Sequence, residues 1–364
     1  MADPVHDETD KLIAEMEKRI NRVYRQAHKE IDAKCDDYFR RFLVKDKLKR
    51  DEMRANIITA QEYAEWRKGQ LIVGDRWIRL RNQLAQDMHN TNVIARSVTS
   101  GYMPEVYAIN HAYGTYQCEV GSGIDTSYTL YSREAVENIL RENPRLLPMP
   151  GKELSAKIAA GKDVLWNKQQ IQSAMLQGIL QGESIPELAK RLRNEVSDTN
   201  RKASIRNART MATTAENAGR LDAYKRAESK GIKLKKTWIA TLDNRTRHAH
   251  RLLDGVTVPV NEPFISEFGE IMCPGDRAAD PANLYNCRCS LIAQIEGFER
   301  DTTASRLVSA THDDGTPMTY AEWKKAKPKS RDILHQEKVG KQMNAAYNKQ
   351  YKERAKEARK KLDK

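Results

Sequence analysis

The stretch WIATLDNRTRHAHRLLDG at 238–255, followed by PGDRAADPANLYNCRC at 274–289 and SLIAQI at 290–295, is the most informative part of this chain. Three cysteines and two histidines fall inside it, within about sixty residues, and such a density of soft ligands is typical of a module held together by a metal ion or by disulfides. Turn residues bound the segment, which predicts a small folding unit. The five residues are His248, His250, Cys273, Cys287 and Cys289.

Three strands are predicted around this segment. Residues 234–239 form the first strand, and alternating valines at 256–260 form the second, which its proline confines to a sheet edge. The third strand covers 285–295, where apolar and polar residues alternate. Cys287 and Cys289 share the apolar face, so both thiols are expected on the buried side.

A C-x-C pair on one strand face puts two sulfurs within reach of one ion, at a spacing that a tetrahedral zinc site can use. His250, on a helical turn that can pack over the strand, is the expected third ligand, with Cys273 or His248 as the fourth. A second interpretation stays open, in which the two cysteines are buried small hydrophobes and the histidine is a hydrogen-bonded core residue. A Cys287–Cys289 disulfide is disfavoured because so small a ring is strained.

Charged residues lie between the first strand and the turn that carries the histidines. Asp243 is a candidate N-cap, and Arg245 and Arg247 are expected to pair with it or with Asp254 and Asp276. Such pairing would hold irregular loops together where little core exists. The functional alternative is that the arginines bind phosphate or a protein partner.

In order and spacing, these residues resemble the signature of the Mu F-like family of phage minor head, or head morphogenesis, proteins. The resemblance extends upstream into a helical region and covers residues 165–298. Relatives usually have another residue where this chain has Cys273, so the resemblance implies no ligand role for Cys273. The matching residues are Trp238, Asp243, Arg245-Thr246-Arg247, His250, Asp254-Gly255, Pro274-Gly275-Asp276 and Asn286-Cys287-Arg288-Cys289, preceded by 182–189, Ala208-Arg209-Thr210 and 215–220.

The resemblance implies a minor structural protein of a tailed-phage head. Such proteins associate with the portal during procapsid assembly and are implicated in head morphogenesis or DNA delivery. It therefore implies location in the virion, inside the capsid near the portal, after synthesis in the host cytoplasm. The implied partners are the portal protein and a scaffold or major capsid protein.

Two other functions stay open on the residues alone. One is a metal-dependent nuclease or hydrolase that uses the His/Cys set, and the other is a nonspecific DNA-binding protein without a capsid role. Against an enzyme, the chain has no H-E-x-x-H motif, no paired carboxylate set and no phosphate-cradling glycine loop. We therefore expect that the protein is not an enzyme.

Positive charge is concentrated in two segments of a chain whose net charge is +13. Residues 321–364 hold 15 Lys or Arg against 6 Asp or Glu, and residues 186–247 hold 16 against 7. Clustered lysines without interleaved aromatic residues predict nonspecific binding to double-stranded DNA, with a solvated helix or a docking tail as the alternative. The predicted DNA-binding residues are Lys324, Lys325, Lys327, Lys329, Lys352, Arg354, Lys356, Arg359, Lys360 and Lys361.

The length of 364 residues allows two or three domains, and 39% hydrophobic residues are enough for a core. Five cysteines without regular spacing fit reduced thiols. No apolar run reaches membrane-spanning length and the N-terminus has no signal-peptide core, so we expect a soluble protein made in a cytoplasm, with no membrane needed for assembly.

The predicted fold is α+β and mostly helical. Helices are expected at 8–44, 51–68, 75–98, 164–180, 185–196 and 202–229, with breaks at Gly69, Gly74 and Ser100-Gly101. The first helix has a heptad-like apolar seam, for which packing inside its own domain is preferred over a coiled coil. The predicted regions are a helical N-terminal region at 1–142 with a hairpin near 114–131, a linker at 143–151, a helical middle region at 152–235, the small Mu F-like module at 236–298 and a basic helical tail at 299–364.

Overall fold

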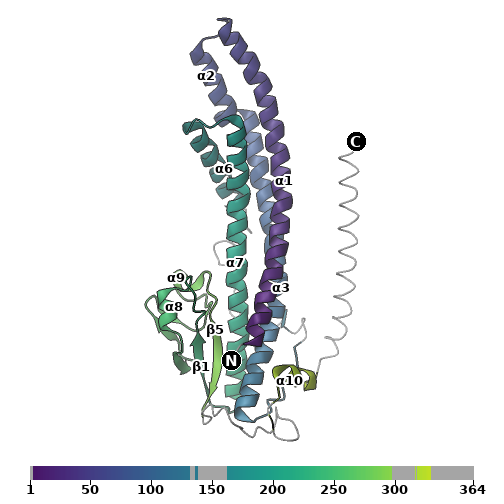
Figure 1. The fold of residues 1–364 in the computed structure, drawn as a ribbon, viewed down its shortest axis with the longest axis vertical. Helices are drawn as coiled ribbons and strands as arrows, with labels where there is room; N and C mark the ends of the chain where they lie inside the picture. Colours follow the sequence, from purple (N-terminus) through teal and green to yellow (C-terminus); the bar gives the residue numbers. More distant parts are fainter. Residues whose placement is uncertain (1–2, 132–135, 138–161, 297–315, 317, 329–364) are drawn as a thin grey trace.

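The structure is a computed structural model that describes residues 3–131, 136–137, 162–296, 316 and 318–328. Long helices form a stalk, and a small mixed domain and a short helix lie beside its lower part (Figure 1). The predicted class, α+β and mostly helical, is confirmed. The helices are α1 (Pro4–Arg54), α2 (Ala60–Lys68), the π-helical turn η1 (Gly69–Val73), α3 (Asp75–Ser122), α6 (Lys162–Leu180), α7 (Ile185–Ser229), α8 (His248–Leu252), α9 (Pro281–Leu284) and α10 (Tyr320–Ala326).

The helix α3 corrects two predictions. It continues through Ser100-Gly101, where a break was expected, and through 114–122, where a hairpin was expected. Gly123, in the left-handed conformation, ends it, and the N–H of Gly123 donates to the carbonyl of Glu119 (2.9 Å). Cys118 is buried as predicted, but on a helix and not on a strand. Tertiary packing of the long helix overrides the local preference of these residues for turns.

The helix α7 is also longer than predicted. We expected two helices, 185–196 and 202–229, but 45 residues form one helix whose N-terminal capping box joins Ser184 and Glu187. The helix α7 runs parallel to α3, because residue numbers rise along both helices from one contact to the next, as from Asn92–Asn200 to Tyr107–Asp222. Contacts with α1 advance in opposite senses, so α1 is antiparallel to both.

One hydrophobic core joins α1, α3, α6 and α7. The seam predicted on the first helix faces this core, since Met16, Ile20, Ala27 and Ile31 are buried in it. A coiled coil with another chain is therefore not needed to cover these residues. They are covered from within the bundle, as the preferred interpretation required.

A layer of polar side chains crosses this core. Asn92 of α3 accepts a hydrogen bond from Tyr24 of α1 (2.5 Å) and donates to Asn200 of α7 (2.9 Å). Asn200 donates in turn to Asn167 of α6 (2.8 Å), and Asp163 accepts from Asn92 (3.3 Å). Buried polar groups that satisfy one another only in one alignment favour a single helix register.

The small domain contains two antiparallel sheets. In the first the strand order is β2-β1-β5, with Trp238 opposite Leu291, and β2 lies at the edge as predicted. The hairpin β3–β4 was not predicted, and Asn283 of α9 ties it down by donating to the Ser266 hydroxyl (2.9 Å). The strands are β1 (Leu234–Ile239), β2 (Thr257–Pro259), β3 (Phe264–Ser266), β4 (Gly269–Ile271) and β5 (Ser290–Ile295).

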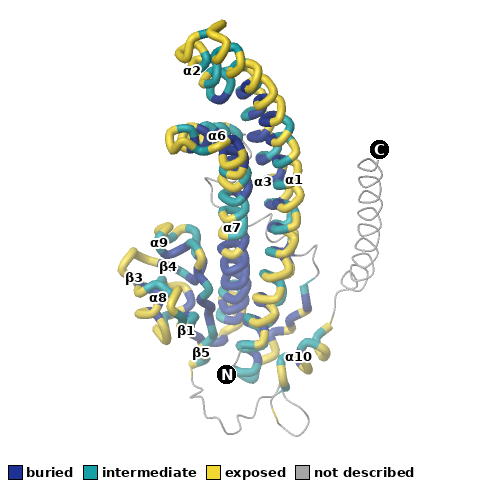
Figure 2. Tube along the Cα trace, turned by 45° about the horizontal axis from the view of Figure 1, so that its top comes forward, coloured by how far each residue is buried: buried dark blue, intermediate teal, exposed yellow. Residues whose placement is uncertain are grey.

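Residues 210–220 of α7 are all buried (Figure 2), because the other long helices cover one face and the small domain covers the opposite face. Among the described helices, none has the length and apolarity needed to cross a membrane. The predicted linker at 143–151 lies outside the described residues.

Candidate functional site

The loop that leads from β1 to His250 is built around Asp243. Its carboxylate accepts from the backbone N–H of Arg245 (2.9 Å) and from the Arg288 guanidinium (2.7 Å). Arg288 holds the pKa of Asp243 well below its usual range. The predicted N-cap role is wrong, because the residue before α8 is Arg247 and it makes no side-chain cap. Arg245 pairs with Asp243 as predicted (3.5 Å), but the shorter contact comes from Arg288, which was not predicted. Arg247 instead donates to the Tyr285 carbonyl.

The segment that carries the two cysteines precedes a strand and is not part of it. β5 begins at Ser290, and Asn286 has a left-handed backbone (φ +56°) that interrupts the predicted 285–295 strand. Cys287 and Cys289 are nevertheless both 2% exposed, as predicted for one buried side. The Thr241 hydroxyl donates to the Arg288 carbonyl between them (2.6 Å), which fixes the segment against the end of β1.

His250, Cys287 and Cys289 meet in the interior of the small domain. The Nδ1 atom of His250 lies 3.6 Å from Sγ of Cys287 and 3.7 Å from Sγ of Cys289. The three ligand atoms lie within 4.8 Å of one another. Trp238 covers the imidazole edge-on, with ring centroids 5.2 Å apart. Three of the predicted metal ligands are thus brought together from two segments.

The shared environment shifts the pKa values of the two thiols in opposite directions. A hydrogen bond from Cys287, together with His250, lowers the pKa of Cys289 to about 5. The same contact with Cys289, together with burial, raises the pKa of Cys287 well above its usual value. The two thiols therefore titrate as a coupled pair.

The two candidates for a fourth ligand lie elsewhere. Cys273 is buried beside Lys236, where desolvation raises the pKa of its thiol to about 12, and it is not in the group that can hold one ion. The His248 side chain is 76% exposed and lies 3.9 Å from Glu267. Neither residue therefore lies where a fourth ligand was predicted. Cys273 follows β4 and His248 begins α8, and the sequence pattern does not predict the direction of the chain at either point.

Side chains of α7 bind the backbone of the cysteine segment, a feature that sequence reasoning missed. Thr213 donates to the Cys287 carbonyl (2.7 Å), and Asn217 donates to the Cys289 carbonyl (3.1 Å) while accepting from the N–H of Leu291 (2.9 Å). Thr210 accepts from the N–H of Asn286 (3.2 Å). Threonines and an asparagine at helical spacing within the motif region were the available signal. Their partners are backbone groups far away in sequence.

The turn at 274–276 closes on the same helix. Gly275 has φ +78°, and its carbonyl accepts from the Thr214 hydroxyl (2.8 Å). A Cβ at this position would lie 2.9 Å from the Thr214 nitrogen, so only glycine fits between the loop and the helix. The predicted turn is confirmed, since the N–H of Asp276 donates to the Cys273 carbonyl (3.0 Å).

Arg220 joins three parts of the molecule at the lower end of α7. Its fully buried guanidinium donates to Asn110 of α3 (2.9 Å), to the Leu291 carbonyl (2.8 Å) and to Asp3, which caps α1 (2.5 Å). Glu216 also lies beside it (3.4 Å). Two residues of the resemblance motif at 215–220 therefore form a buried charged junction.

The start of the basic tail is anchored and not free. Trp323 of α10 donates to the buried carboxylate of Glu119 (2.7 Å), and the Lys327 ammonium lies 2.9 Å from that carboxylate and 3.0 Å from Asp125. Lys327 was predicted to contact DNA, but its charge is already matched within the protein. Lys325 is exposed and Lys324 half-buried. Outside the described residues lie Lys329, Lys352, Arg354, Lys356, Arg359, Lys360 and Lys361.

Two arginines of the second basic segment, 186–247, pair with acidic residues of α1. Arg193 pairs with Asp32 (2.8 Å), and Arg209 pairs with Glu17. These two positive charges therefore contribute to the contact between α7 and α1.

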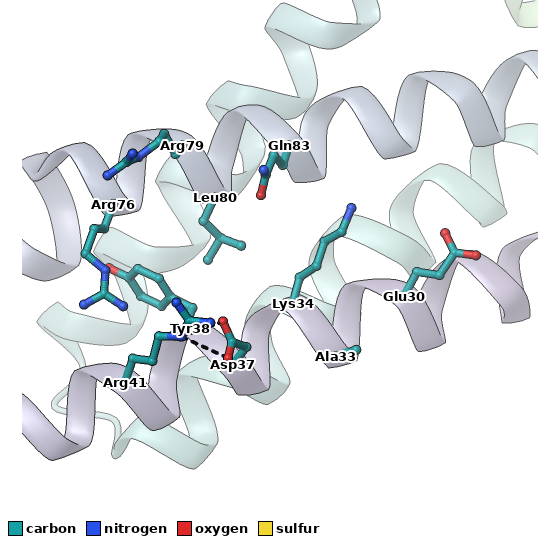
Figure 3. A pocket seen from close by; sticks show the side chains of 10 residues that line it. All are labelled: Glu30, Ala33, Lys34, Asp37, Tyr38, Arg41, Arg76, Arg79, Leu80 and Gln83. Carbon is teal, nitrogen blue, oxygen red and sulfur yellow. Dashed lines mark hydrogen bonds and ion pairs between the residues drawn. The ribbon is translucent and has the colours of Figure 1, made fainter. Parts of the chain in front are cut away.

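A groove of about 640 Å³ lies on the stalk between α1 and α3 (Figure 3). Its walls carry charges of both signs, and Asp37 pairs with Arg41 (2.9 Å) inside it. Tyr38 lies at its base under Arg76.

Comparisons with known proteins give a consistent family. Residues 169–292 match the family described as Phage Mu protein F like protein. The chain is 27% identical over 335 residues to minor head protein GP7 of Bacillus phage SPP1, a match that covers 88% of this chain and 96% of that protein. No solved structure matches.

Two bacterial proteins match over shorter parts. An Enterococcus faecalis protein named NAD(+)--arginine ADP-ribosyltransferase EFV is 28% identical over 211 residues, which are 57% of this chain and 40% of that protein. An uncharacterized protein of Haemophilus influenzae is 25% identical over 219 residues, which are 59% of this chain and 42% of that protein. The chain thus spans less than half of either bacterial protein.

Proposed function

Because the chain belongs to the Mu F-like family of phage minor head proteins, we propose that it associates with the portal, acts in procapsid morphogenesis and DNA delivery, and contacts DNA nonspecifically. A structural role in the phage head, contact with other head components and a place in the virion follow from the family itself. The observation that carries the proposal is the extent of the match to the SPP1 minor head protein, which includes 88% of this chain and 96% of that protein.

The upper end of the stalk is the proposed portal-binding surface. Apolar side chains are exposed there, at the end of α1 and in the turns around α2 and η1. A group of exposed apolar residues at one end of a molecule is a candidate protein contact. We call this group the tip surface, and its residues are Leu43, Val44, Leu48, Ile57 and Val73.

Co-expression with the portal protein of the same phage tests this proposal. The wild-type chain is expected to co-purify with the portal and to occur in procapsids that contain it. Lysine at Val44 and Leu48 should abolish the interaction, because both side chains are about 60% exposed and free to contact a partner. The matched control places lysine at Leu252 and Ile265, which are equally exposed on the small domain.

Two results would contradict the proposal at different levels. Absence of the wild-type chain from portal-containing procapsids would contradict portal association as a whole. Equal loss of binding in the tip and control variants would contradict the tip surface alone. Scaffold and major capsid protein, expressed in place of the portal, identify any other head partner.

The basic tail is the proposed DNA contact. The anchoring of α10 by Glu119 and its aromatic neighbours gives the lysine-rich segment a fixed starting point on the body. If six or more phosphates are neutralised, affinity for duplex DNA should fall about a thousandfold between 50 and 200 mM salt. Removal of residues 329–364, which leaves α10 intact, should weaken binding and flatten the salt dependence. Unchanged binding by this truncated chain would contradict the tail as the contact.

We further propose that the role is structural and not catalytic. The activity in the name of the Enterococcus faecalis protein belongs to a protein of which this chain spans 40%. A hydrolase built on the His/Cys set would need substrate access, but its three side chains are only 1–2% exposed. Cleavage of supercoiled plasmid by the purified chain with Mg²⁺, Mn²⁺ or Zn²⁺, absent in the Cys289→Ser variant, would contradict this proposal.

A further inference from the structure

We propose that His250, Cys287 and Cys289 bind one zinc ion, which ties α8 to the chain segment that enters β5. Cys287 and Cys289 follow His250 by 37 and 39 positions. No strand pairing of the described residues links α8 to the cysteine segment. All are buried, and all direct a metal-binding atom to one point. The inference concerns the small domain alone and is independent of the proposed portal contact.

The two nitrogen–sulfur distances fit a tetrahedral zinc ion. Zn–S bonds of about 2.3 Å and Zn–N bonds of about 2.0–2.1 Å at the tetrahedral angle place sulfur and nitrogen about 3.6 Å apart. The two observed separations from His250 Nδ1 are 3.6 and 3.7 Å. The distance from the histidine nitrogen to each cysteine sulfur is therefore the one that a tetrahedral zinc ion requires.

Hydrogen bonding alone explains the cluster less well. Both sulfurs approach the same atom, Nδ1 of His250, which holds either one proton or one lone pair. It can therefore make only one good hydrogen bond, and the second sulfur is left against it without a bond. A metal ion accepts the nitrogen lone pair and both thiolates at once.

The surroundings suit metal-bound thiolates. The backbone N–H of Cys289 donates toward Sγ of Cys287 (3.5 Å), the kind of outer contact that steadies a ligand sulfur. Two thiolates also neutralise the charge of Zn²⁺, so the group as a whole can be buried without net charge. Trp238 and Leu253 belong to the same apolar cluster as the cysteines, so little solvent reaches the ligands.

The described residues supply three protein ligands, so one position of a tetrahedral site is not filled by them. No described Cys, His, Asp or Glu joins the three within ligand distance, since Cys273 and His248 lie elsewhere. The role of the ion is structural, because α8 is a single short helical turn and the cysteine segment has no strand partner of its own. In such a domain the energy of metal binding contributes directly to folding.

Elemental analysis of the full chain, purified under reducing conditions from zinc-supplemented cells, tests the site. We expect about one zinc per chain in the wild type and a small fraction of that in Cys287→Ser and Cys289→Ser. Cys273→Ser is the matched control, since this cysteine is also buried in the same domain but lies outside the cluster, and the variant should retain the zinc.

Cobalt substitution covers the case in which the serine variants fail to fold. The wild-type chain loaded with Co²⁺ should show visible bands of a tetrahedral ion and a near-ultraviolet thiolate-to-metal band. Cys273→Ser should give the same spectrum. Zinc well below one equivalent in the wild type, with no uptake of Zn²⁺ or Co²⁺ from solution, would overturn the proposal. A Cys287–Cys289 disulfide found by mass spectrometry in the reduced preparation, or loss of zinc in Cys273→Ser, would also overturn it.

Discussion

The two ends of the stalk are built on different principles. Toward the lower end, residues 210–220 of α7 are all buried, and polar side chains among them bind backbone or charged partners inside the chain. At the upper end, apolar residues such as Leu48 and Ile57 face solvent, with exposures of 60% and 71%. Contacts within the chain therefore hold the lower end together, whereas the upper end has apolar surface that the described residues leave uncovered.

Removal of the Arg220 side chain should have the largest effect on the lower end. Arg220→Ala removes a fully buried cation from Asp3 and Glu216, and Glu216 keeps only its pair with His6 among the ion pairs of the described residues. Loss of one partner of a buried ion pair costs about 3–5 kcal/mol. Arg245→Ala is the control, because the Arg245 side chain is 73% exposed and its pair with Asp243 should add little stability. Denaturant unfolding of the full chain measures both. Equal losses would mean that the junction adds no stability.

A methyl group at Gly219 should separate two helices. Its Cβ would lie 2.5 Å from the Tyr107 carbonyl oxygen of α3, so the helices must move apart at a cost of about 2–4 kcal/mol. Gly101→Ala is the matched helical control, since nothing lies within 4 Å of its Cβ. There the substitution should stabilise by about 0.5–1 kcal/mol. Thermal unfolding should therefore shift in opposite directions, and a shift in the same direction would contradict the tight crossing.

The ion pair of His6 should make the lower end sensitive to alkaline pH. A hydrogen bond with Glu216 (2.8 Å) raises the pKa of His6 to about 9. A raised pKa stabilises the fold fully below the unfolded value of about 6.5 and loses this effect as pH rises through 9. We expect the wild type to lose about 3 kcal/mol relative to His6→Gln between pH 6 and pH 9.5.

The difference between wild type and variant is the quantity to compare. Burial lowers the pKa of Lys236 to about 8, so this residue increases stability as pH rises and partly opposes His6. Both proteins contain Lys236, and its contribution cancels in the difference. A difference that does not change with pH would show that His6 and Glu216 are not coupled.

Lysine at the tip should have the smallest effect on stability. Val44 and Leu48 are about 60% exposed, so their replacement should change the unfolding free energy by less than about 0.5 kcal/mol each. The same change should abolish portal binding if the tip surface is the contact. A large loss of stability would instead show that the tip is covered in the isolated protein, and the contrast between the two ends would fail.

The sequence was informative where neighbouring residues decide the structure. Alternating valines and a proline predicted β2 and its edge position, which the pairing with β1 confirms. The C-x-C spacing and the apolar pattern predicted that Cys287 and Cys289 lie on one buried side, with His250 as a candidate neighbour, and the three residues do meet. The hairpin near 114–131 was wrong for a non-local reason. Tyr116 and its neighbours contact Trp323 and Tyr320 far along the chain, and this packing holds a helix where alternation predicted strands.

Partners distant in sequence also explain what was missed in the site. Thr213 and Asn217 looked like ordinary polar helix residues, because the carbonyls they bind belong to a loop more than 70 positions away. Cys273 was predicted as a candidate ligand but lies outside the cluster. The spacing of residues in the sequence does not show in which direction the chain runs after β4. Residue types indicated the chemistry, but the geometry depended on how α7 meets the module.

The continuity of α7 sets the direction in which the small domain faces. The helix enters the polar layer at Asn200 and binds the cysteine segment at Asn217, with no break between them. Each residue of an α-helix advances the axis by about 1.5 Å and rotates it by about 100°. One residue inserted between these two asparagines would turn the domain about a quarter of the way around the stalk, whereas seven would nearly restore its azimuth. The number of residues in this helix therefore determines the angle between the small domain and the bundle.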